Sequence, residues 1–186
     1  DVRSRQKPLR QLYDEAPEAA WVYDRARTSA SEVAATHPIH GHVICGENSP
    51  VEVPVSIHKA VGGESDFPCP GEILAAALAS CLDTAIRMIA NIMGVRLAHL
   101  EVKVCLGADV RGTLRMGNKV PVGFQSAAVE VEIKPETDLP EKQLHALLNA
   151  AEHSCVILET LRNPPTVQIE RKVQIAKEGL PIEKVE

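Results

Sequence analysis

The stretch from Ile73 to Met93 is the most apolar part of this 186-residue chain and constrains its fold most strongly. Pro70 suits the first turn of a helix, where no backbone hydrogen bond is lost, and Gly94 is a natural C-terminal cap. Polar residues interrupt the apolar stretch, namely Ser80, Asp83, Thr84, Arg87 and Asn91. A membrane span needs an almost continuous apolar run, so we predict a long core helix over residues 70–93.

Alternating apolar and polar residues predict strands on both sides of this helix. Residues 51–59 alternate, and the turn-rich segment Gly46–Pro50 precedes them, so residues 42–45 and 51–59 are expected to form a hairpin. Pro54 cannot donate to a sheet ladder and therefore suits an edge strand. Two segments after the helix alternate in the same way, residues 98–110 and 127–133.

A second helix and a last strand complete the expected order of elements. Leucines fall on one face of a helix over residues 141–152, and residues 166–175 have the pattern of a closing strand. Strands, a long helix, two strands, a second helix and a final strand make an α+β protein rather than alternating βαβ units.

The length is sufficient for one domain with a full hydrophobic core, or for two small lobes that share one. Residues 1–20 have only a weak helical pattern and are expected to form an arm or a short helix. Residues 21–186 are expected to form a single α+β domain. Within it we expect an N-terminal strand lobe, a helix-strand lobe and a solvated tail, over residues 21–66, 67–176 and 177–186 respectively.

Composition excludes several function classes. A net charge of -5 offers no basic surface, so we expect no nucleic-acid partner, and the polar positions in the long helix argue against a membrane. Five cysteines without clustered spacing, and no recognisable signal peptide at the start of the sequence, favour a reducing, cytoplasmic setting.

Two cysteines stand out by position. Cys81 lies inside the long helix, on its apolar side, and Cys155 follows the second predicted helix. A thiol in such a place is either a small buried hydrophobe or a reactive group. Reactivity needs a nearby cation or a helix N-terminus to lower the thiol pKa, and Arg87 lies well around the helix from Cys81. The spacing leaves both interpretations open.

The sequence around these cysteines resembles that of the OsmC/Ohr family of thiol-dependent hydroperoxide reductases. The resemblance rests on Pro70-x-Glu72-Ile73-Leu74-x-Ala76-x-Leu78-Ala79-x-Cys81, followed by Ala151-Glu152-x-x-Cys155. Three other segments also fit, Gly62-Gly63, Asp109-Val110-Arg111-Gly112 and Val120-Pro121-Val122-Gly123-Phe124. The resemblance covers roughly residues 40–170.

The resemblance implies an OsmC-like fold, an intertwined homodimer with paired central helices between sheets. It implies an oxidoreductase in which Cys81 attacks the O–O bond of an organic hydroperoxide as a thiolate. Cys155 then resolves the resulting sulfenic acid as a disulfide, and a dithiol reductant resets the pair. No metal and no organic cofactor are needed.

The sequence departs from the family pattern at two supporting positions. Residues 36–42 contain no arginine where Ohr members place one, and Gly71 stands where they carry a glutamate. Glu72 matches a second acidic position, but a helix would place it roughly 13 Å along the axis from Cys81, so we expect it to stabilise the helix N-terminus. The cation beside Cys81 is then expected from Arg111, Arg25, Arg27 or a histidine of the other subunit.

Several other residues carry two interpretations each. Arg111 is either half of a surface pair with Asp109 or a binding residue near the interface site. His153 is either a surface histidine or an aid to proton transfer at Cys155. Cys69 is either a bystander or an alternative resolving thiol. Cys105, within an alternating strand, is expected in the core.

The pattern His37-x-x-His40-x-His42-x-x-Cys45 has the ligand types of a zinc site. On a strand, His40 and His42 share one face and Cys45 falls on the other. We therefore expect solvated or hairpin histidines here and no metal site.

Two other functions stay open beside hydroperoxide reduction. One is a catalytically weak or inactive protein that binds an apolar ligand at the dimer interface, which the missing arginine and Gly71 favour. The other is a general thiol oxidoreductase acting on disulfides, which lacks the usual Cys-x-x-Cys spacing.

Overall fold

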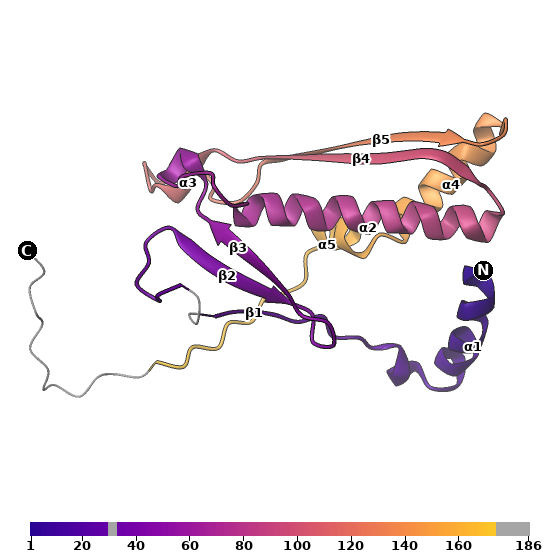
Figure 1. Cartoon of the computed structure of the whole chain (residues 1–186), viewed down its shortest axis with the longest axis horizontal. Coiled ribbons are helices and arrows are strands. Elements are labelled where there is room, and N and C mark those ends of the chain that lie inside the picture. Colours follow the sequence, from indigo (N-terminus) through magenta and orange to yellow (C-terminus); the bar gives the residue numbers. More distant parts are fainter. Residues whose placement is uncertain (30–32, 174–186) are drawn as a thin grey trace, which may run out of the picture.

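A 24-residue helix, α2 (Pro70–Met93), forms the axis of the molecule (Figure 1). The structure is a computed structural model and describes residues 1–29 and 33–173. The helix begins with Pro70 in its first turn and ends at Gly94, whose φ of 71° is in the left-handed region that favours glycine. The sequence prediction for this helix is confirmed at both ends.

An antiparallel pair of long strands covers one side of α2, β4 (Leu97–Gly107) and β5 (Ser126–Pro135) (Figure 1). Their register pairs Val102 with Val131. The apolar residues of both strands pack on the core of α2, which explains the alternation in the sequence. The core consists of Leu78, Leu82, Ala85, Ile86, Ala90, Val95, Leu147, Ala151 and Cys155.

Two helices near the C-terminal end pack against α2, namely α4 (Glu141–His153) and α5 (Val156–Arg162). Leu147 of α4 is fully buried and belongs to the core cluster. Each fully buried leucine or isoleucine contributes roughly 1.5–3 kcal/mol relative to an exposed one, so this contact fixes α4 firmly on α2.

A second, three-stranded antiparallel sheet lies below the N-terminal half of α2 in Figure 1. It consists of β1 (Ala26–Thr28), β2 (His40–Cys45) and β3 (Val51–Ser56), in that order. The predicted hairpin is confirmed, although its second strand ends at Ser56 and a short 3-10 helix, η2 (Lys59–Val61), follows. Pro54 lies on the edge strand of this sheet, as expected.

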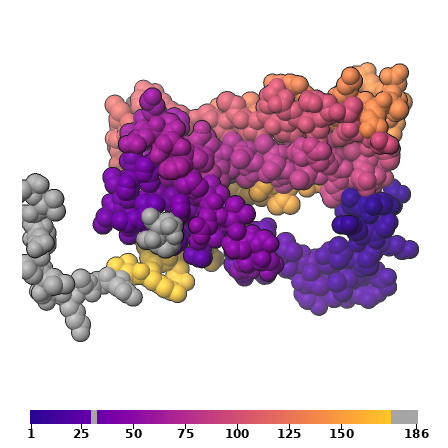
Figure 2. All heavy atoms as spheres, in the orientation of Figure 1, coloured from indigo at the N-terminus to yellow at the C-terminus, as the bar shows by residue number. Residues whose placement is uncertain are grey.

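The N-terminal segment forms helix α1 (Val2–Glu15) and a 3-10 turn, η1 (Pro17–Ala20). It contacts the C-terminal end of α2, where the Val2 amide donates to Asn91 Oδ1 at 2.9 Å. Figure 2 shows an open gap between this segment and the rest of the molecule. Part of α2 therefore stays uncovered within one chain.

By length and composition α2 could cross a membrane, and it is the one helix in the described residues that meets this test. Its place between the β4–β5 sheet and helices α4 and α5 is that of a core helix. Only 28% of its most apolar window is buried within the single chain. The helix thus leaves apolar surface exposed, which a further packing partner would bury.

Two expectations about local structure were wrong. Residues 166–173 form no strand, because a strand needs a neighbouring edge to pair with and this segment is exposed throughout. The remaining positions of that expected strand, 174–175, and the expected tail 177–186 lie outside the described residues. The strand expected over residues 98–110 ends at Gly107, and its last expected position begins one helical turn, α3 (Val110–Thr113).

Candidate functional site

The thiols of Cys81 and Cys155 meet in the core. Cys81 is half-buried on α2, and Cys155 is fully buried at the junction of α4 and α5. Both belong to the same cluster of packed side chains, and the Cys81 thiol acts directly on the ionisation of Cys155. The structure therefore brings together the two cysteines that the sequence singled out.

The break between α4 and α5 places Cys155 against α2. The Ser154 amide still bonds to the carbonyl of Ala150 at 3.1 Å, and then Cys155 leaves the helix and starts α5 as its N-cap. Ala151 is fully buried where α4 meets α2, and its small side chain allows close approach of the two helices. The position of the Cys155 sulfur thus depends on the end of α4 at His153, two residues earlier.

Burial raises the pKa of the Cys155 thiol, and its interaction with the Cys81 thiol raises it further. The backbone amides of Leu158 and Ile157, at the start of α5, act in the opposite direction but do not reverse the shift. Cys155 therefore holds its proton and can donate it in a hydrogen bond to the Cys81 sulfur.

An open hollow of about 400 Å³ lies beside Cys155, at the start of α5. Its lining includes Cys155, Glu159 and the exposed His153. His153, expected either at the surface or near Cys155, is in fact both exposed and part of the same hollow.

Glu72 caps the N-terminus of α2, as the sequence predicted. Its Oε2 accepts a hydrogen bond from the Cys69 amide at 2.8 Å, and this bond is the main reason that the pKa of Glu72 is lowered. Glu72 and Cys81 lie nine residues apart on one helix, roughly 13 Å along its axis. Within one chain, Glu72 is therefore a structural cap.

Arg111 forms a surface ion pair with Asp109. Its Nε donates to both oxygens of the Asp109 carboxylate at 3.0 Å, and this contact lowers the pKa of Asp109. The pair lies in α3, which sits at the N-terminal end of α2 in Figure 1. Within one chain, Arg111 follows the surface-pair interpretation.

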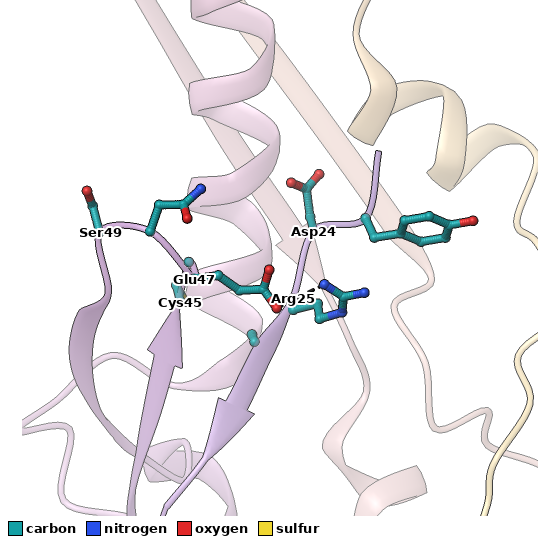
Figure 3. Close-up of a pocket in the computed structure, with 9 residues that line it drawn as sticks. Asp24, Arg25, Cys45, Glu47 and Ser49 are labelled. Atoms are coloured by element: carbon teal, nitrogen blue, oxygen red, sulfur yellow. Dashed lines mark hydrogen bonds and ion pairs between the residues drawn. The ribbon is translucent and has the colours of Figure 1, made fainter. Parts of the chain in front are cut away.

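Arg25 is also engaged, at the hollow drawn in Figure 3. Its Nη1 lies 2.9 Å from Glu47 Oε1, and its guanidinium lies 5.8 Å from the centre of the Tyr23 ring. The hollow, about 620 Å³, lies between the start of β1 and the β2–β3 turn and includes Cys45 but neither Cys81 nor Cys155. Arg27 is exposed on β1.

An apolar hollow of about 590 Å³ lies at the start of α2, between this helix, the end of β4 and the segment before β5. Both remaining cysteines line it: Cys69 is buried, whereas Cys105 is exposed, so the expectation that Cys105 is a core residue was wrong. Cys105 falls on the face of β4 that points away from α2, because alternate strand residues face opposite ways.

The ring of Phe124 lies beside Gly71. A Cβ atom added at Gly71 would lie 2.9 Å from Cζ of Phe124, closer than such contacts allow. The aromatic ring thus takes the space in which a side chain at position 71 would begin. Both residues belong to segments that stand out in the sequence. The sequence does not predict their contact, because these segments are far apart along the chain.

Comparisons with known proteins agree with this fold. A model of the family described as OsmC-like protein matches residues 62–170. A search of curated proteins found no significant match.

Three solved structures illustrate the likeness of fold. An organic hydroperoxide resistance protein OsmC from Legionella pneumophila, also described as a predicted redox protein and regulator of sulfide bond formation, is 21% identical with a TM-score of 0.56 over 77% of this chain and 92% of its own. An organic hydroperoxide resistance protein from Elizabethkingia anophelis is 19% identical with a TM-score of 0.56 over 78% of this chain and 91% of its own. An OsmC-like protein from Mycoplasma pneumoniae is 14% identical with a TM-score of 0.58 over 77% of this chain and 89% of its own.

At these identities the solved structures establish the fold alone. The family model covers more than half of the chain and includes both segments that carry the paired thiols, so the chain belongs to the OsmC-like protein family.

Proposed function

We propose that this protein reduces organic hydroperoxides, with Cys81 as the peroxidatic thiol and Cys155 as the resolving thiol. The observation that carries the proposal is the contact between the two thiols across the α2–α5 packing. Membership of the OsmC-like family, and a fold shared with organic hydroperoxide resistance proteins, support the same substrate class.

The chemistry proceeds in two steps. The Cys81 thiolate attacks one peroxide oxygen, the O–O bond breaks, and the departing alkoxide takes up a proton and leaves as an alcohol. Cys81 is then a sulfenic acid. The Cys155 sulfur attacks the Cys81 sulfur, the S–O bond breaks, water leaves and a disulfide forms. An external dithiol returns two electrons and two protons and restores both thiols.

The working unit in this proposal is an intertwined homodimer. The uncovered apolar surface of α2 supports it, as do exposed apolar side chains in extended segments at both ends of the domain. These are Trp21, Val22, Tyr23, Val167 and Ile169. Side chains of this kind favour packing against a second chain.

The same proposal assigns the cation that activates Cys81 to the partner subunit. Arg27 and Arg111 are exposed, and Arg25 and Arg111 are already paired within their own chain. We measure the rate at which iodoacetamide alkylates Cys81 against pH in Arg27→Ala and Arg111→Ala. A rise in the apparent thiol pKa in one variant identifies the cation, and unchanged profiles in both exclude these two arginines.

Titration of free thiols before and after one equivalent of cumene hydroperoxide tests the main reaction. Loss of two thiols per chain is expected, recovered on adding a dithiol and abolished in Cys81→Ser. An unchanged thiol count in the wild-type protein rules out the proposed reaction. A cytoplasmic, reducing setting is part of the proposal, because the dithiol must be regenerated.

A catalytically weak protein that binds an apolar ligand is the second candidate. The apolar hollow at the start of α2 favours this candidate. So does Gly71, which stands where the family pattern has a glutamate and has the ring of Phe124 beside it. This candidate predicts slow alkylation of Cys81 that peroxide does not prevent, and saturable binding of an apolar fluorescent probe.

A further inference from the structure

Three side chains that the redox chemistry does not use converge at the start of β2. The imidazole of His40 and the carboxylates of Glu64 and Asp66 each offer one ligand atom, and these atoms lie within 4.8 Å of one another. His40 comes from β2, whereas both acids come from the loop before α2. A nitrogen and two oxygens held together from separate segments form a set that divalent metal ions bind.

The environment of His40 Nε2 points to a ligand. This atom is buried and makes no well-directed hydrogen bond, although Asp66 Oδ2 lies only 2.8 Å away. A buried ring nitrogen without a directed partner is costly unless something else satisfies it. A metal ion bound along the lone pair of Nε2 would do so, and the nearby carboxylates would complete its coordination.

The dimensions also suit a metal. Ligand atoms about 2.0–2.1 Å from a tetrahedral zinc ion lie roughly 3.3 Å from one another. His40 Nε2 and Asp66 Oδ2 are somewhat closer than this, at 2.8 Å, and all the ligand atoms of the cluster lie within 4.8 Å of one another. Side-chain rotation is sufficient to adjust them, because both carboxylates are exposed at the rim.

The surroundings hold His40 in place. The ring of His37 stacks on it with centroids 4.7 Å apart, and Phe67 meets it edge-on at 5.6 Å. The loop is tied to β3 because the Ser56 amide donates to the Pro68 carbonyl at 3.3 Å. The ring and the loop are therefore oriented before any ion binds, which favours affinity.

A similar group elsewhere lacks this character. His99, Glu101 and Glu132 also lie within 4.8 Å of one another, but all are exposed. The Lys103 ammonium lies 2.6 Å from Glu132 and 3.3 Å from Glu101, so this group already holds a cation. His99 therefore provides a matched control.

We propose that His40, Glu64 and Asp66 form a binding site for a divalent transition-metal ion, with zinc as the best fit. Water fills the remaining position. The ion ties the start of β2 to the loop that leads into α2. The sequence pattern of histidines and Cys45 contributes His40 alone as a ligand, because the other ligands come from a segment that the pattern does not include.

Zinc binding to the full-length protein tests the site. Metal-free protein, kept reduced, is titrated with Zn²⁺ against a chromophoric chelator, and the bound ion is characterised by X-ray absorption. We expect one ion per chain in a shell of nitrogen and oxygen at about 2.0–2.1 Å. Sulfur at about 2.3 Å would assign the ion to a cysteine site and overturn the proposal, as would no binding below 100 µM Zn²⁺.

Variants locate the ion. His40→Gln and Asp66→Asn should each weaken binding beyond the roughly 10–100-fold loss typical of outer-sphere partners, and His99→Gln should leave it unchanged. Glu64→Gln, at an exposed position, tests the site without risk to folding and should weaken binding about tenfold or more. Equal affinity in Glu64→Gln and the wild type would exclude the three-ligand site. These results do not depend on the reactivity of Cys81.

Discussion

Cys155 lies against Cys81 in the core but is the more buried of the two, with no exposed surface of its own. Its pKa is raised by burial and by the Cys81 thiol. In the proposed reaction, the partly exposed Cys81 is therefore the sulfur that the substrate reaches first, and Cys155 reacts with the oxidised Cys81. The difference in exposure supports this order of the two steps.

The first prediction separates these steps. In Cys155→Ser, one equivalent of hydroperoxide should still oxidise Cys81, and dimedone should trap the sulfenic acid, because no neighbouring thiol condenses with it. Intact mass spectrometry should show one dimedone adduct per chain and no intramolecular disulfide. Cys81→Ser should show neither.

Cys105→Ser is the matched control, since Cys105 is an exposed thiol on β4 outside the pair. It should form the Cys81–Cys155 disulfide at the wild-type rate. If disulfide formation failed in this variant but persisted in Cys155→Ser, Cys105 rather than Cys155 would be the resolving thiol.

The second prediction concerns stability at alkaline pH. In the unfolded chain a thiol ionises near pH 8.5, whereas buried Cys155 keeps its proton to higher pH. The unfolded state then binds fewer protons, so the free energy of unfolding should fall as pH rises above about 8.5, by up to about 1.4 kcal/mol per pH unit. Below that pH the contribution of Cys155 is fully present.

Urea unfolding of reduced protein between pH 7 and 10, at fixed protein concentration, measures this effect. Cys155→Ala should flatten the alkaline decline, whereas Cys105→Ala should retain it. Identical slopes in Cys155→Ala and the wild type would show that Cys155 ionises alike in the folded and unfolded states.

The sequence predicted the elements better than their contacts. Proline and glycine at the ends of α2 and the alternation in β4 act locally, so both elements could be predicted. The approach of Cys155 to Cys81 could be expected only through family resemblance, because it depends on the break after His153. The strand expected over residues 166–175 illustrates the limit, since pairing depends on a neighbour that the local pattern does not name.

The candidate metal site shows a related limit of prediction from sequence. The histidine pattern has suitable ligand types, but strand geometry separates His40 from Cys45. The acids that meet His40 lie more than 20 residues later, in a loop without periodicity. Ligand types can therefore be recognised in sequence, whereas the set that converges depends on the tertiary fold.

The third prediction concerns the glycine pair before α2. A Cβ atom at Gly63 would overlap the backbone carbonyl of Ile57, which cannot move aside as a side chain can. Gly63→Ala should therefore lower the free energy of unfolding by about 1–3 kcal/mol. Gly123→Ala, where nothing lies within 4 Å, should change it by no more than about 0.5 kcal/mol. Equal stabilities in urea would show that the loop at Gly63 rearranges freely.

The fourth prediction concerns the cap of α2. The pKa of Glu72 is lowered chiefly by the Cys69 amide, so its stabilising contribution is present above about pH 4.3 and is lost as pH falls through the lower folded value. Glu72→Gln should lower the Tm at pH 7, and the gap from wild type should narrow in acid. Glu64→Gln, at an acid outside the capping box, serves as the control, with both variants and the wild type measured metal-free. A gap that is constant from pH 7 to pH 3 would contradict capping by the ionised carboxylate.

The last prediction tests the contact between Gly71 and Phe124. Alanine in a helix is favoured over glycine by about 0.5–1 kcal/mol, but in the wild-type protein its Cβ would meet Cζ of Phe124 at 2.9 Å. Gly71→Ala should therefore bring little or no gain in stability alone, and a gain of about 0.5–1 kcal/mol once Phe124→Ala has removed the ring. Urea unfolding of the two single variants and the double variant gives the coupling free energy, expected at 0.5 kcal/mol or more. Additive effects would show that the ring moves aside without cost and that Phe124 does not account for the glycine at this position.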